Sequence, residues 1–475
     1  MDGYRKTYRA WDAEQNCHDP ISPRDALPES DLVFFLIDLI GQLDLTPFHQ
    51  YYAREPRGQP PFDVTMMVTL LVYAYSVGVC SSRKINAACE RNLAFRAIVG
   101  DDRPDFRTLS DFRKIHRMAM KSLFVEVLRV AGKLGMVKLG NLSTDGTKMR
   151  ANASRHKAMS YGYMNKEITR LEAEVEQLLK DAERLDTEQD AALGSRRGDE
   201  LPDELKRREE RLAKIREAKA RLEAEARAEA EAEQRRRDQA QAQREADGRK
   251  RRGKEPAAVD PTPDDKAQTN FTDPEAKIMK QSNKGFDYSY NAQAVVDSAD
   301  QIIVAAEVTQ AANDKQQAVP MAQAALDNLE AAGIPRPMAA DGTPLCIPNT
   351  ADTGYFSAAA VQGLENIGME PYLAVERQKH HEASVASETT APSAEASAKE
   401  KMRHKLGSEV GKALYAARKH IVEPVFGQTK SARGIRRFLL RGVEKVSAEW
   451  LLICLTHNLL KIWRRVSGVR ASSGG

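Results

Sequence analysis

The sequence is poor in cysteine and has no long apolar run. Its five cysteines include no Cys-x-x-Cys pair; they are Cys17, Cys80, Cys89, Cys346 and Cys454. Scattered thiols in a long chain argue against a disulfide scaffold or a clustered zinc site and indicate a reducing compartment. The longest apolar runs, such as Leu32–Ile40, are too short to span a membrane, and residues 1–16 lack the apolar segment of a signal peptide. We therefore expect a cytoplasmic protein without a membrane partner.

The net charge is also small, but the charge is unevenly distributed. The whole chain carries a formal charge of +4. Between Gly411 and Arg465 there are 12 Lys and Arg against 3 Glu. A basic stretch of this kind suits a polyanion, because each neutralised phosphate releases condensed counterions. The alternative is an ordinary solvated helical face.

Residues 1–135 are predicted to be helical. Apolar runs cover Leu32–Leu45 and Val64–Val77, and a third helix is expected over 83–100. Thr108 and Asp111 resemble a capping box that opens a fourth helix. Basic residues lie between these helices, namely Arg83, Lys84, Arg91, Arg96, Arg103 and Arg107. Helices of this length with such residues fit a helix-turn-helix-like DNA reader or a plain helical bundle equally well.

A strand is expected around Asp145, and a different kind of segment follows it. Residues 165–252 contain 23 basic and 24 acidic residues. Two thin apolar seams run through them, formed by Ile168, Leu171, Val175 and Leu178 and by Leu205, Leu212, Ile215 and Leu222. This pattern predicts an antiparallel helical hairpin that turns near residues 194–203. Residues 253–270 are expected to be a flexible linker.

Strand signals resume after the linker. Residues 286–297 and 301–310 predict a β-hairpin, and a helix is expected over 315–332. A strand is then predicted to end at Asp341, followed by a helix at about 357–367 and a strand at 371–376. Residues 381–402 are low in complexity and expected to be disordered. Without the insertion, an α/β (α+β) core with a mixed sheet remains, which is not a doubly wound parallel pattern.

Five blocks of sequence carry a resemblance to a known family. The helical half contains PPFDVTMMVTLLVYAYSVGVCSSRKI and RPDFRTLSDFRKIH; further on come STDGTKMRANASRHKAMSYG, ADTGYFS and IVEPVFGQTKSARGIRRFLLRG. Over nearly its full length the chain resembles bacterial insertion-sequence DDE transposases. These have a helical transposase N-terminal domain and an RNase H-like catalytic domain. The resemblance implies a helical DNA-binding domain at 1–135 and a catalytic domain at 136–164 and 271–465, interrupted by the hairpin.

The resemblance also implies the site residues. Asp145, Asp352 and Glu423 would be the catalytic acids and the ligands of Mg²⁺ or Mn²⁺. The DNA-binding residues would be Tyr415, Arg418, Lys430, Arg433, Arg436, Arg437 and Lys148. Phosphodiester cleavage suits such a set, because two divalent ions held by carboxylates activate the attacking water and stabilise the leaving oxygen.

Three local features leave alternatives open. Asp352 lies eleven positions after the predicted strand end at Asp341, so Asp341 is the alternative second acid. Pro424 implies that Glu423 sits at the start of a helix or that the helix kinks there. Asp314 precedes a helix and is most simply its cap.

The expected function is DNA transposition. The partners would be double-stranded DNA, both the element's terminal inverted repeats and the target, and further copies of the chain; the location would be the bacterial cytoplasm, at the nucleoid when DNA is bound. The main alternative is a catalytically inactive transposase-derived DNA-binding protein. A coiled-coil scaffold and a host nuclease on the same fold are further alternatives. The inserted hairpin could join protomers, cover the DNA or act as a passive spacer.

Overall fold

Helices fill the N-terminal part of the structure. The computed structural model describes residues 22–52, 61–193, 203–246, 257–376 and 395–468, apart from residues 24 and 282, and single residues 248 and 393. The first helices are α1 (Leu32–Ile40), α2 (Thr46–Tyr52), α3 (Val64–Ser76), α4 (Ser82–Arg91), α5 (Leu93–Val99), α6 (Phe106–Ile115) and α7 (Arg117–Lys133). Nearly every residue of α3 is buried, so this helix lies at the centre of the helical region.

Two of the predicted helices are each divided in two. The Asn92 side chain accepts hydrogen bonds from the backbone N–H groups of Ala94 and Phe95, so the chain restarts as α5 after α4 ends. Asp105, not Thr108, caps α6, because its carboxylate accepts from Arg107 N and Thr108 N. The helix expected from Thr108 onward is interrupted at His116, which separates α6 from α7.

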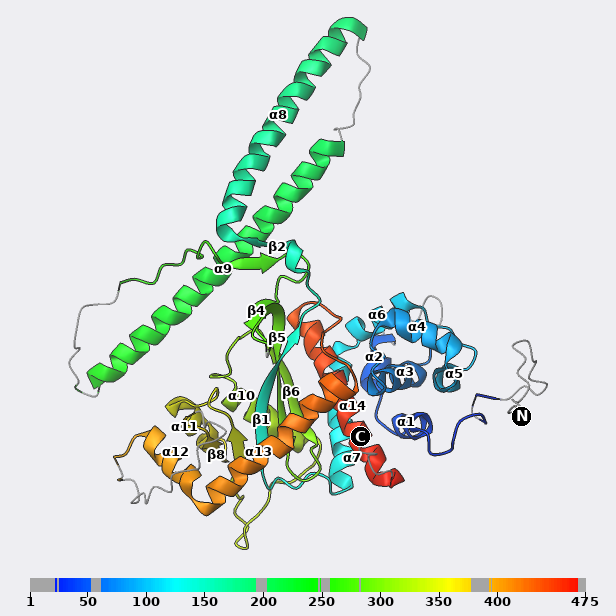
Figure 1. Ribbon diagram of the computed structural model, residues 1–475, viewed down its shortest axis with the longest axis vertical. Helices are drawn as coiled ribbons and strands as arrows, with labels where there is room; N and C mark the ends of the chain where they lie inside the picture. The colour runs from blue at the N-terminus through cyan, green and yellow to red at the C-terminus, as the bar shows by residue number, and fades with distance from the viewer. Residues whose placement is uncertain are drawn as a thin grey trace, which may run out of the picture.

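A mixed sheet forms the second half of the molecule (Figure 1). Its strands are β1 (Leu142–Arg150), β4 (Lys277–Lys280), β5 (Phe286–Asp297), β6 (Ile303–Thr309), β7 (Ile347–Ala351) and β8 (Met369–Leu373). The long strand β5 pairs antiparallel with β1 and carries both β4 and β6 on its other edge, while β7 and β8 continue parallel to β1. The order β6-β5-β1-β7-β8 agrees with the RNase H-like mixed sheet that the family resemblance implies. The predicted β-hairpin is confirmed as β5 and β6.

Helices cover both faces of this sheet. Helix α13 (Glu409–Gly427) crosses β1, β5, β7 and β8, and α14 (Val443–Ser467) packs on β6 on the same face. Helix α10 (Ala318–Ala331) packs on the opposite face, while α11 (Ala358–Asn366) packs against α10 and β8. Alternate residues of β1 therefore face α13 or α10, which decides what each polar side chain in this strand can meet.

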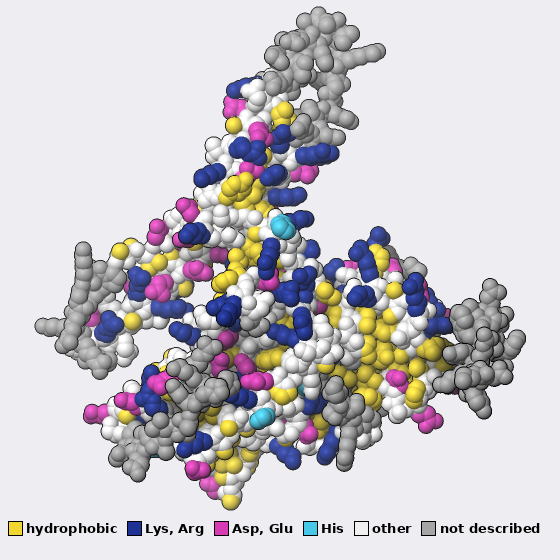
Figure 2. Space-filling model, in the orientation of Figure 1, with side chains coloured by type: hydrophobic (Ala, Val, Ile, Leu, Met, Phe, Trp, Pro, Cys, Tyr) yellow, Lys and Arg dark blue, Asp and Glu magenta, His cyan; other side chains and the backbone are white. Residues whose placement is uncertain are grey.

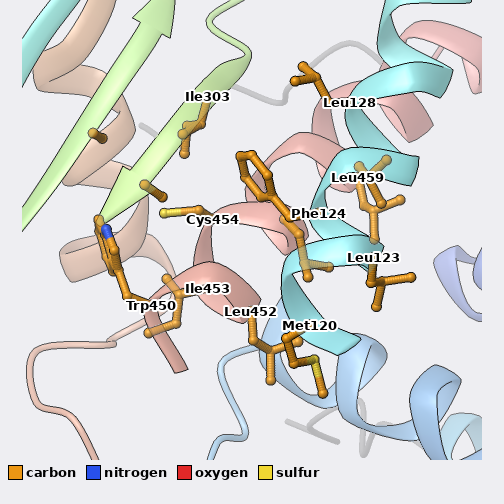
Figure 3. Packing of buried hydrophobic residues seen from close by; sticks show 14 of the residues in the cluster. Met120, Leu123, Phe124, Leu128, Ile303, Trp450, Leu452, Ile453, Cys454 and Leu459 are labelled. Atoms are coloured by element: carbon orange, nitrogen blue, oxygen red, sulfur yellow. The ribbon is translucent and has the colours of Figure 1, made fainter. Parts of the chain in front are cut away.

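One hydrophobic core joins the N-terminal helices to the sheet. Buried Phe124 of α7 faces Cys454 of α14 and Ile303 of β6, as Figure 3 shows. The same cluster of buried residues extends from Leu32 in α1 to Ile462 in α14. The helical region and the sheet are thus packed as one unit.

The predicted hairpin is present as α8 (Tyr161–Leu193) and α9 (Asp203–Ala246), and its turn lies outside the described residues. A small hydrophobic cluster separate from the main core holds its base; the buried members are Tyr161, Met164, Leu171, Leu212, Ile215, Ala218 and Leu222. Arg208 pairs with Glu174 and Arg211 with Glu167 across the two helices. None of the described helices is long and apolar enough to cross a membrane.

Two segments expected to lack structure contain short elements. The linker prediction fails at its end, where β3 (Gln268–Asn270) pairs antiparallel with β2 (Ala158–Ser160). The prediction of disorder for 381–402 fails at its end, where α12 (Ala398–Gly407) begins; residues 381–392 lie outside the described residues. The Ser397 hydroxyl accepts from Glu400 N, and the Glu400 carboxylate accepts from Ser397 N. This capping box within a low-complexity stretch is what starts the helix.

Candidate active site

Strands β1 and β7 bring Asp145 and Asp352 to the same edge of the sheet. In the parallel register Leu142 lies opposite Asn349 and Ser143 opposite Thr350. Asp145 therefore lies close to the level of Asp352, which directly follows the last residue of β7. The charge of Asp352 contributes to raising the pKa of Asp145, as expected for neighbouring carboxylates.

The strand before Asp352 differs from the prediction. Residues 338–344 form a tight turn closed by a bridge between Met338 and Pro344, and Asp341 is exposed and accepts from Thr343. The strand that carries Asp352 is Ile347–Ala351, so no extra loop separates this acid from the sheet.

A proline and an asparagine concealed that strand in the sequence. Pro348 is tolerated because the pairing with β1 begins only at Asn349, so the missing N–H breaks no bond to β1. The Asn349 side chain is fully buried and donates to Thr144 Oγ1, which satisfies part of its polarity inside the sheet.

Arg418 of α13 pairs directly with Asp145. Its Nη1 lies 3.1 Å from Asp145 Oδ2, and the residue is 9% exposed. Its guanidinium carbon also lies 5.7 Å from the centre of the Tyr415 ring, within range of a cation–π interaction. The pair is therefore a largely buried ion pair, and in this state Arg418 neutralises an acid instead of standing free to bind a phosphate.

Burial sets the protonation of Asp145. Removal of the carboxylate from water raises the pKa of Asp145 to about 6, and the positive charge of Arg418 opposes this rise. The negative charge of Asp352 raises the pKa further. A cation placed between the two aspartates would favour their ionised forms, which is the behaviour expected of a metal-binding pair.

Two lysines lie near the acids on opposite faces of β1. Lys430 belongs to a π-helical turn, Gln428–Ala432, and its Nζ donates to Thr147 Oγ1 at 2.5 Å and to Lys148 O at 3.0 Å. Lys148 points the other way, with its Nζ 3.5 Å from Asp314 Oδ1. Burial lowers the pKa of both ammonium groups. Both predicted DNA-binding lysines therefore border the acidic pair.

Glu423 is the predicted acid that the structure leaves apart. It lies inside α13, so of the two alternatives for Pro424 the helix start at Glu423 is wrong. Its side chain is exposed and makes no hydrogen bond or ion pair with Asp145 or Asp352 among the described contacts, although its charge acts on Arg418. Within the described residues no three Asp, Glu, His or Cys side chains lie close enough together to hold a metal ion.

Pro424 is accommodated within α13 by a distant side chain. A proline at this position cannot donate to the carbonyl of His420 four residues earlier. Gln301 Nε2 donates to that carbonyl at 2.7 Å instead. The helix then widens into the π-helical turn that carries Lys430. Because the helix is irregular between Glu423 and Lys430, their seven-residue spacing alone does not tell whether the two side chains lie on the same face.

The sequence analysis missed the role of Asp314. It does not cap α10, which begins at Ala318 after Gln317 without a side-chain cap. Its carboxylate accepts from Asn291 Nδ2 at 2.6 Å and from Gln293 Nε2 at 2.7 Å. Both partners are fully buried on the central strand β5. Asp314 is therefore a further acid beside the candidate site.

This acid connects to Asp352 through a short relay. Gln293 Oε1 accepts from the hydroxyl of Tyr355, three residues after Asp352, and Asp352 Oδ1 accepts from Gly354 N at 2.9 Å. Gly146, opposite Gln293 on β1, is required, because a side chain there would collide with the Gln293 amide. The available signal was the run of polar residues at alternate positions from 287 to 293 of β5, of which Asn291 and Gln293 prove to be fully buried.

The predicted DNA-binding arginines divide into two kinds. Arg433 is buried and donates to Ile453 O, Thr456 Oγ1 and Thr429 Oγ1, so its guanidinium supports the core. Burial lowers its pKa to about 10. We therefore do not assign Arg433 to a DNA surface. Arg436 and Arg437 are exposed. Figure 2 shows Lys and Arg side chains gathered between the base of the hairpin and the helices α4 and α6.

Two transposase families match the chain. The sheet order agrees with the RNase H-like fold that the family resemblance implies. The model of the Transposase domain (DUF772) matches residues 22–115, and the model of the Transposase DDE domain matches residues 377–463. Both models describe transposase domains, and together they support an insertion-sequence DDE transposase. The second match includes Arg418 and Glu423 but neither Asp145 nor Asp352. No curated protein and no solved structure matches the chain.

Proposed function

We propose that this transposase binds double-stranded DNA at the terminal inverted repeats of its element, cleaves a phosphodiester there and joins the freed 3′-hydroxyl to target DNA. The observation that carries the proposal is the placement of Asp145 and Asp352 by parallel strands at one edge of the sheet. The basic stretch and the two family matches support DNA as the substrate. We also propose that it acts as a homo-oligomer in the cytoplasm.

The donor set suits a hard divalent cation. Asp145 and Asp352 offer carboxylate oxygens, which Mg²⁺ and Mn²⁺ prefer, and Asp314 lies beside them. Such ions, when bound, supply an activated water and stabilise the leaving oxygen. We propose that Asp145 and Asp352 hold the metal and that Glu423, as the family resemblance implies, completes the set.

The chain's own basic residues would prepare this site for DNA. Arg418 balances the charge of Asp145. Lys430 is oriented by Thr147 and the backbone of β1, which places an ammonium group two residues along the strand from Asp145. A phosphate arriving at the acids would meet this ammonium group, and we propose that Lys430 contacts it. Lys148, Tyr415 and Arg418 would border the same DNA segment.

The decisive test is metal-dependent cleavage of labelled duplexes that carry the inverted repeats flanking the coding sequence. Wild type is expected to cleave them with Mg²⁺ or Mn²⁺. Asp145→Asn and Asp352→Asn should reduce the rate at least about a thousandfold, since each removes a carboxylate from the metal site. Asp341→Asn is the matched control and should cleave like wild type. Cleavage that survives in both Asp145→Asn and Asp352→Asn would refute the proposal.

One observation favours the alternative of a catalytically inactive DNA-binding protein. Glu423 is exposed, and Arg418 forms an ion pair with Asp145. Within the described residues only two of the three predicted acids, Asp145 and Asp352, therefore lie close together. This alternative predicts that wild type binds the duplexes but never cleaves them with any divalent metal. It also predicts that Glu423→Gln changes nothing, whereas an active enzyme should lose its cleavage.

A further inference from the structure

We propose that a basic hollow between the helical region and the catalytic sheet binds a backbone phosphate of the DNA several base pairs from the scissile bond. The hollow has a volume of about 340 Å³ and lies between the turn that joins α3 to α4 and the segment 434–439. This inference rests on the proposed function, because it assumes DNA as the partner. It adds a second contact, away from the acids.

Four cationic side chains that form no ion pair within the described residues border the hollow. They are Lys84 of α4, Arg150 at the end of β1, and Arg436 and Arg437. All four are exposed, and none forms an ion pair with a carboxylate in the described part of the chain. No acidic residue lines the hollow. The charges of Arg150 and Arg437 act on the carboxylate of Asp287, which is already paired with Arg155, so the cations outnumber this nearby carboxylate. The cations therefore repel one another, and an incoming phosphate relieves this repulsion and releases its own counterions.

A buried network holds the wall formed by α3 and α4. Arg113 of α6 is 5% exposed and donates to Cys80 O at 3.0 Å and to Ser82 Oγ at 2.5 Å. These bonds fix the turn before α4, and with it the start of the helix that carries Lys84. Arg113 also donates to the Tyr75 hydroxyl at 2.7 Å. Through Tyr75 the hydrogen-bond network continues to the opposite wall.

The same network holds that opposite wall. The Tyr75 hydroxyl donates to Glu449 at 3.1 Å, and Glu449 accepts the backbone N–H groups of Leu439 and Leu440. Close backbone packing between the walls adds to this, since Gly78 approaches Arg433 O so closely that a side chain at Gly78 would collide with it. The hollow is thus preformed, so a phosphate entering it would cost little ordering of the protein.

Beyond the level of the two aspartates, β1 continues to Arg150 whereas β7 has ended, and the hollow lies at this end of β1. Arg150 follows Asp145 by five residues in one strand, which corresponds to roughly 17 Å at about 3.3 Å per residue. A duplex advances about 3.4 Å per base pair, so a phosphate in the hollow would be roughly five base pairs from the acids. Arg436 continues the connection, because its charge acts on Lys430 beside the acids and its Nε donates to Lys430 O.

A second basic hollow provides an internal comparison. It has a volume of about 650 Å³, lies at the other end of β1 near Leu139, and is bordered by Lys133 and Lys138. It differs in two ways, because one of its arginines, Arg129, is paired with Glu126 and because it lies away from the carboxyl ends of β7 and β8. We therefore expect DNA at the first hollow only.

The test is binding of a labelled duplex by full-length protein, followed by fluorescence anisotropy over a range of salt concentrations. Lys84→Ala and Arg150→Ala should each weaken binding equally on end-sequence and random duplexes. Each should also reduce the slope of log K against log salt by about 0.9, the value for one lost phosphate contact. Lys133→Ala is the control with the same charge change at the second hollow, and it should bind like wild type. Circular dichroism verifies that each variant is folded.

A single neutral methylphosphonate placed about five base pairs from the cleavage position provides the second arm. It should weaken wild type and have little further effect on Lys84→Ala, because the contact is already lost. Unchanged slopes in Lys84→Ala and Arg150→Ala, or an equal loss in Lys133→Ala, would overturn this inference and leave the proposed function intact. Failure of wild type to bind any duplex at low salt would instead overturn the proposed function.

Discussion

At the scale of single residues, the site depends on side chains that are buried and polar at once. Two effects oppose each other on the pKa of Asp145: burial raises this pKa, and the ion pair with Arg418 lowers it. Asp352 depends on a relay in which Tyr355 donates to Gln293 and Gln293 donates to Asp314. An amide has two chemically different ends, so the carboxylate of Asp314 decides that the oxygen of Gln293 faces Tyr355. We infer that Asp314 is a positioning residue for the loop that carries Asp352.

The Asp314 relay is tested by Tyr355→Phe and Asp314→Asn, with metal affinity measured by titration calorimetry with Mn²⁺. Both changes should weaken Mn²⁺ binding several-fold, because Asp352 loses its support, and each should cost about 1–3 kcal/mol of stability by leaving a buried polar group unpaired. Asn328→Ala is the control. It removes another buried amide, which donates to Val304 O, and should cost similar stability without altering Mn²⁺ affinity. An equal loss of Mn²⁺ affinity in the control would contradict the positioning role.

His116 predicts an acid-sensitive stability. The imidazole is 2% exposed among the rings of Phe48, Phe112 and Tyr52, and burial lowers its pKa to about 4 from an unfolded value near 6.5. The unfolded chain therefore binds a proton first as the pH falls, so the contribution to stability is complete above about pH 6.5 and is lost progressively down to about pH 4.

Denaturant unfolding at pH 7 and pH 5 measures this effect. Wild type should lose about 2 kcal/mol more than His116→Phe over that interval, because the phenyl ring fills the same aromatic cluster and does not titrate. Parallel losses in the two proteins would show that His116 is not the titrating group.

At the scale of elements, the hairpin is distinct because its apolar residues do not join the main core. Its buried residues form their own cluster at the base of α8 and α9. Most of its remaining surface is charged, and ion pairs such as Arg216 with Glu172 connect the two helices. Exposed pairs of this kind add little stability, so the base of the hairpin should determine whether it stays folded.

Ile215→Ala should therefore loosen the hairpin alone. The side chain is 2% exposed, and its truncation is expected to cost about 2–4 kcal/mol locally. Hydrogen exchange would show faster exchange of the amides in α8 and α9, with the amides of β1 and α14 unchanged. Equal acceleration throughout the protein would mean that the hairpin and the catalytic unit unfold as one.

At the scale of the whole molecule, the helical region and the catalytic sheet share one core. Phe124 of α7 is fully buried against α14, which in turn packs on β6. The buried network from Arg113 to Glu449 crosses the same boundary. A helical region joined in this way cannot rotate freely about a linker, so its basic residues keep a set distance from the acids.

Phe124→Ala tests this joint folding. The substitution should cost about 3–5 kcal/mol, and the helical region and sheet should still unfold in a single transition. Far-ultraviolet circular dichroism reports the helices, while the fluorescence of Trp450, buried between α13 and the sheet and measured in a Trp11→Phe, Trp463→Phe background, reports the sheet. Midpoints that separate between the two signals would indicate two independently folding domains.

Sequence reasoning succeeded where the signal was periodic or matched a family block. The alternation of β5 and β6, the apolar seams of the hairpin and the block around Asp145 all predicted what the structure contains. It failed where a distant group overrides a local rule. Pro348 lies in a strand because β1 pairs only from the next residue, and Pro424 lies in a helix because Gln301 satisfies the freed carbonyl.

The amino-acid sequence by itself indicated the family, a mixed sheet with an inserted hairpin, and Asp145 with either Asp352 or Asp341 as candidate acids. These follow from side-chain type and spacing, which act over a few residues. Only the tertiary structure decided that Arg418 pairs with Asp145, that Glu423 lies apart, that Arg433 supports the core and that Asp314 joins the site. Each of these contacts joins residues from different elements, and the direction of a side chain across such a boundary depends on packing that no local pattern encodes.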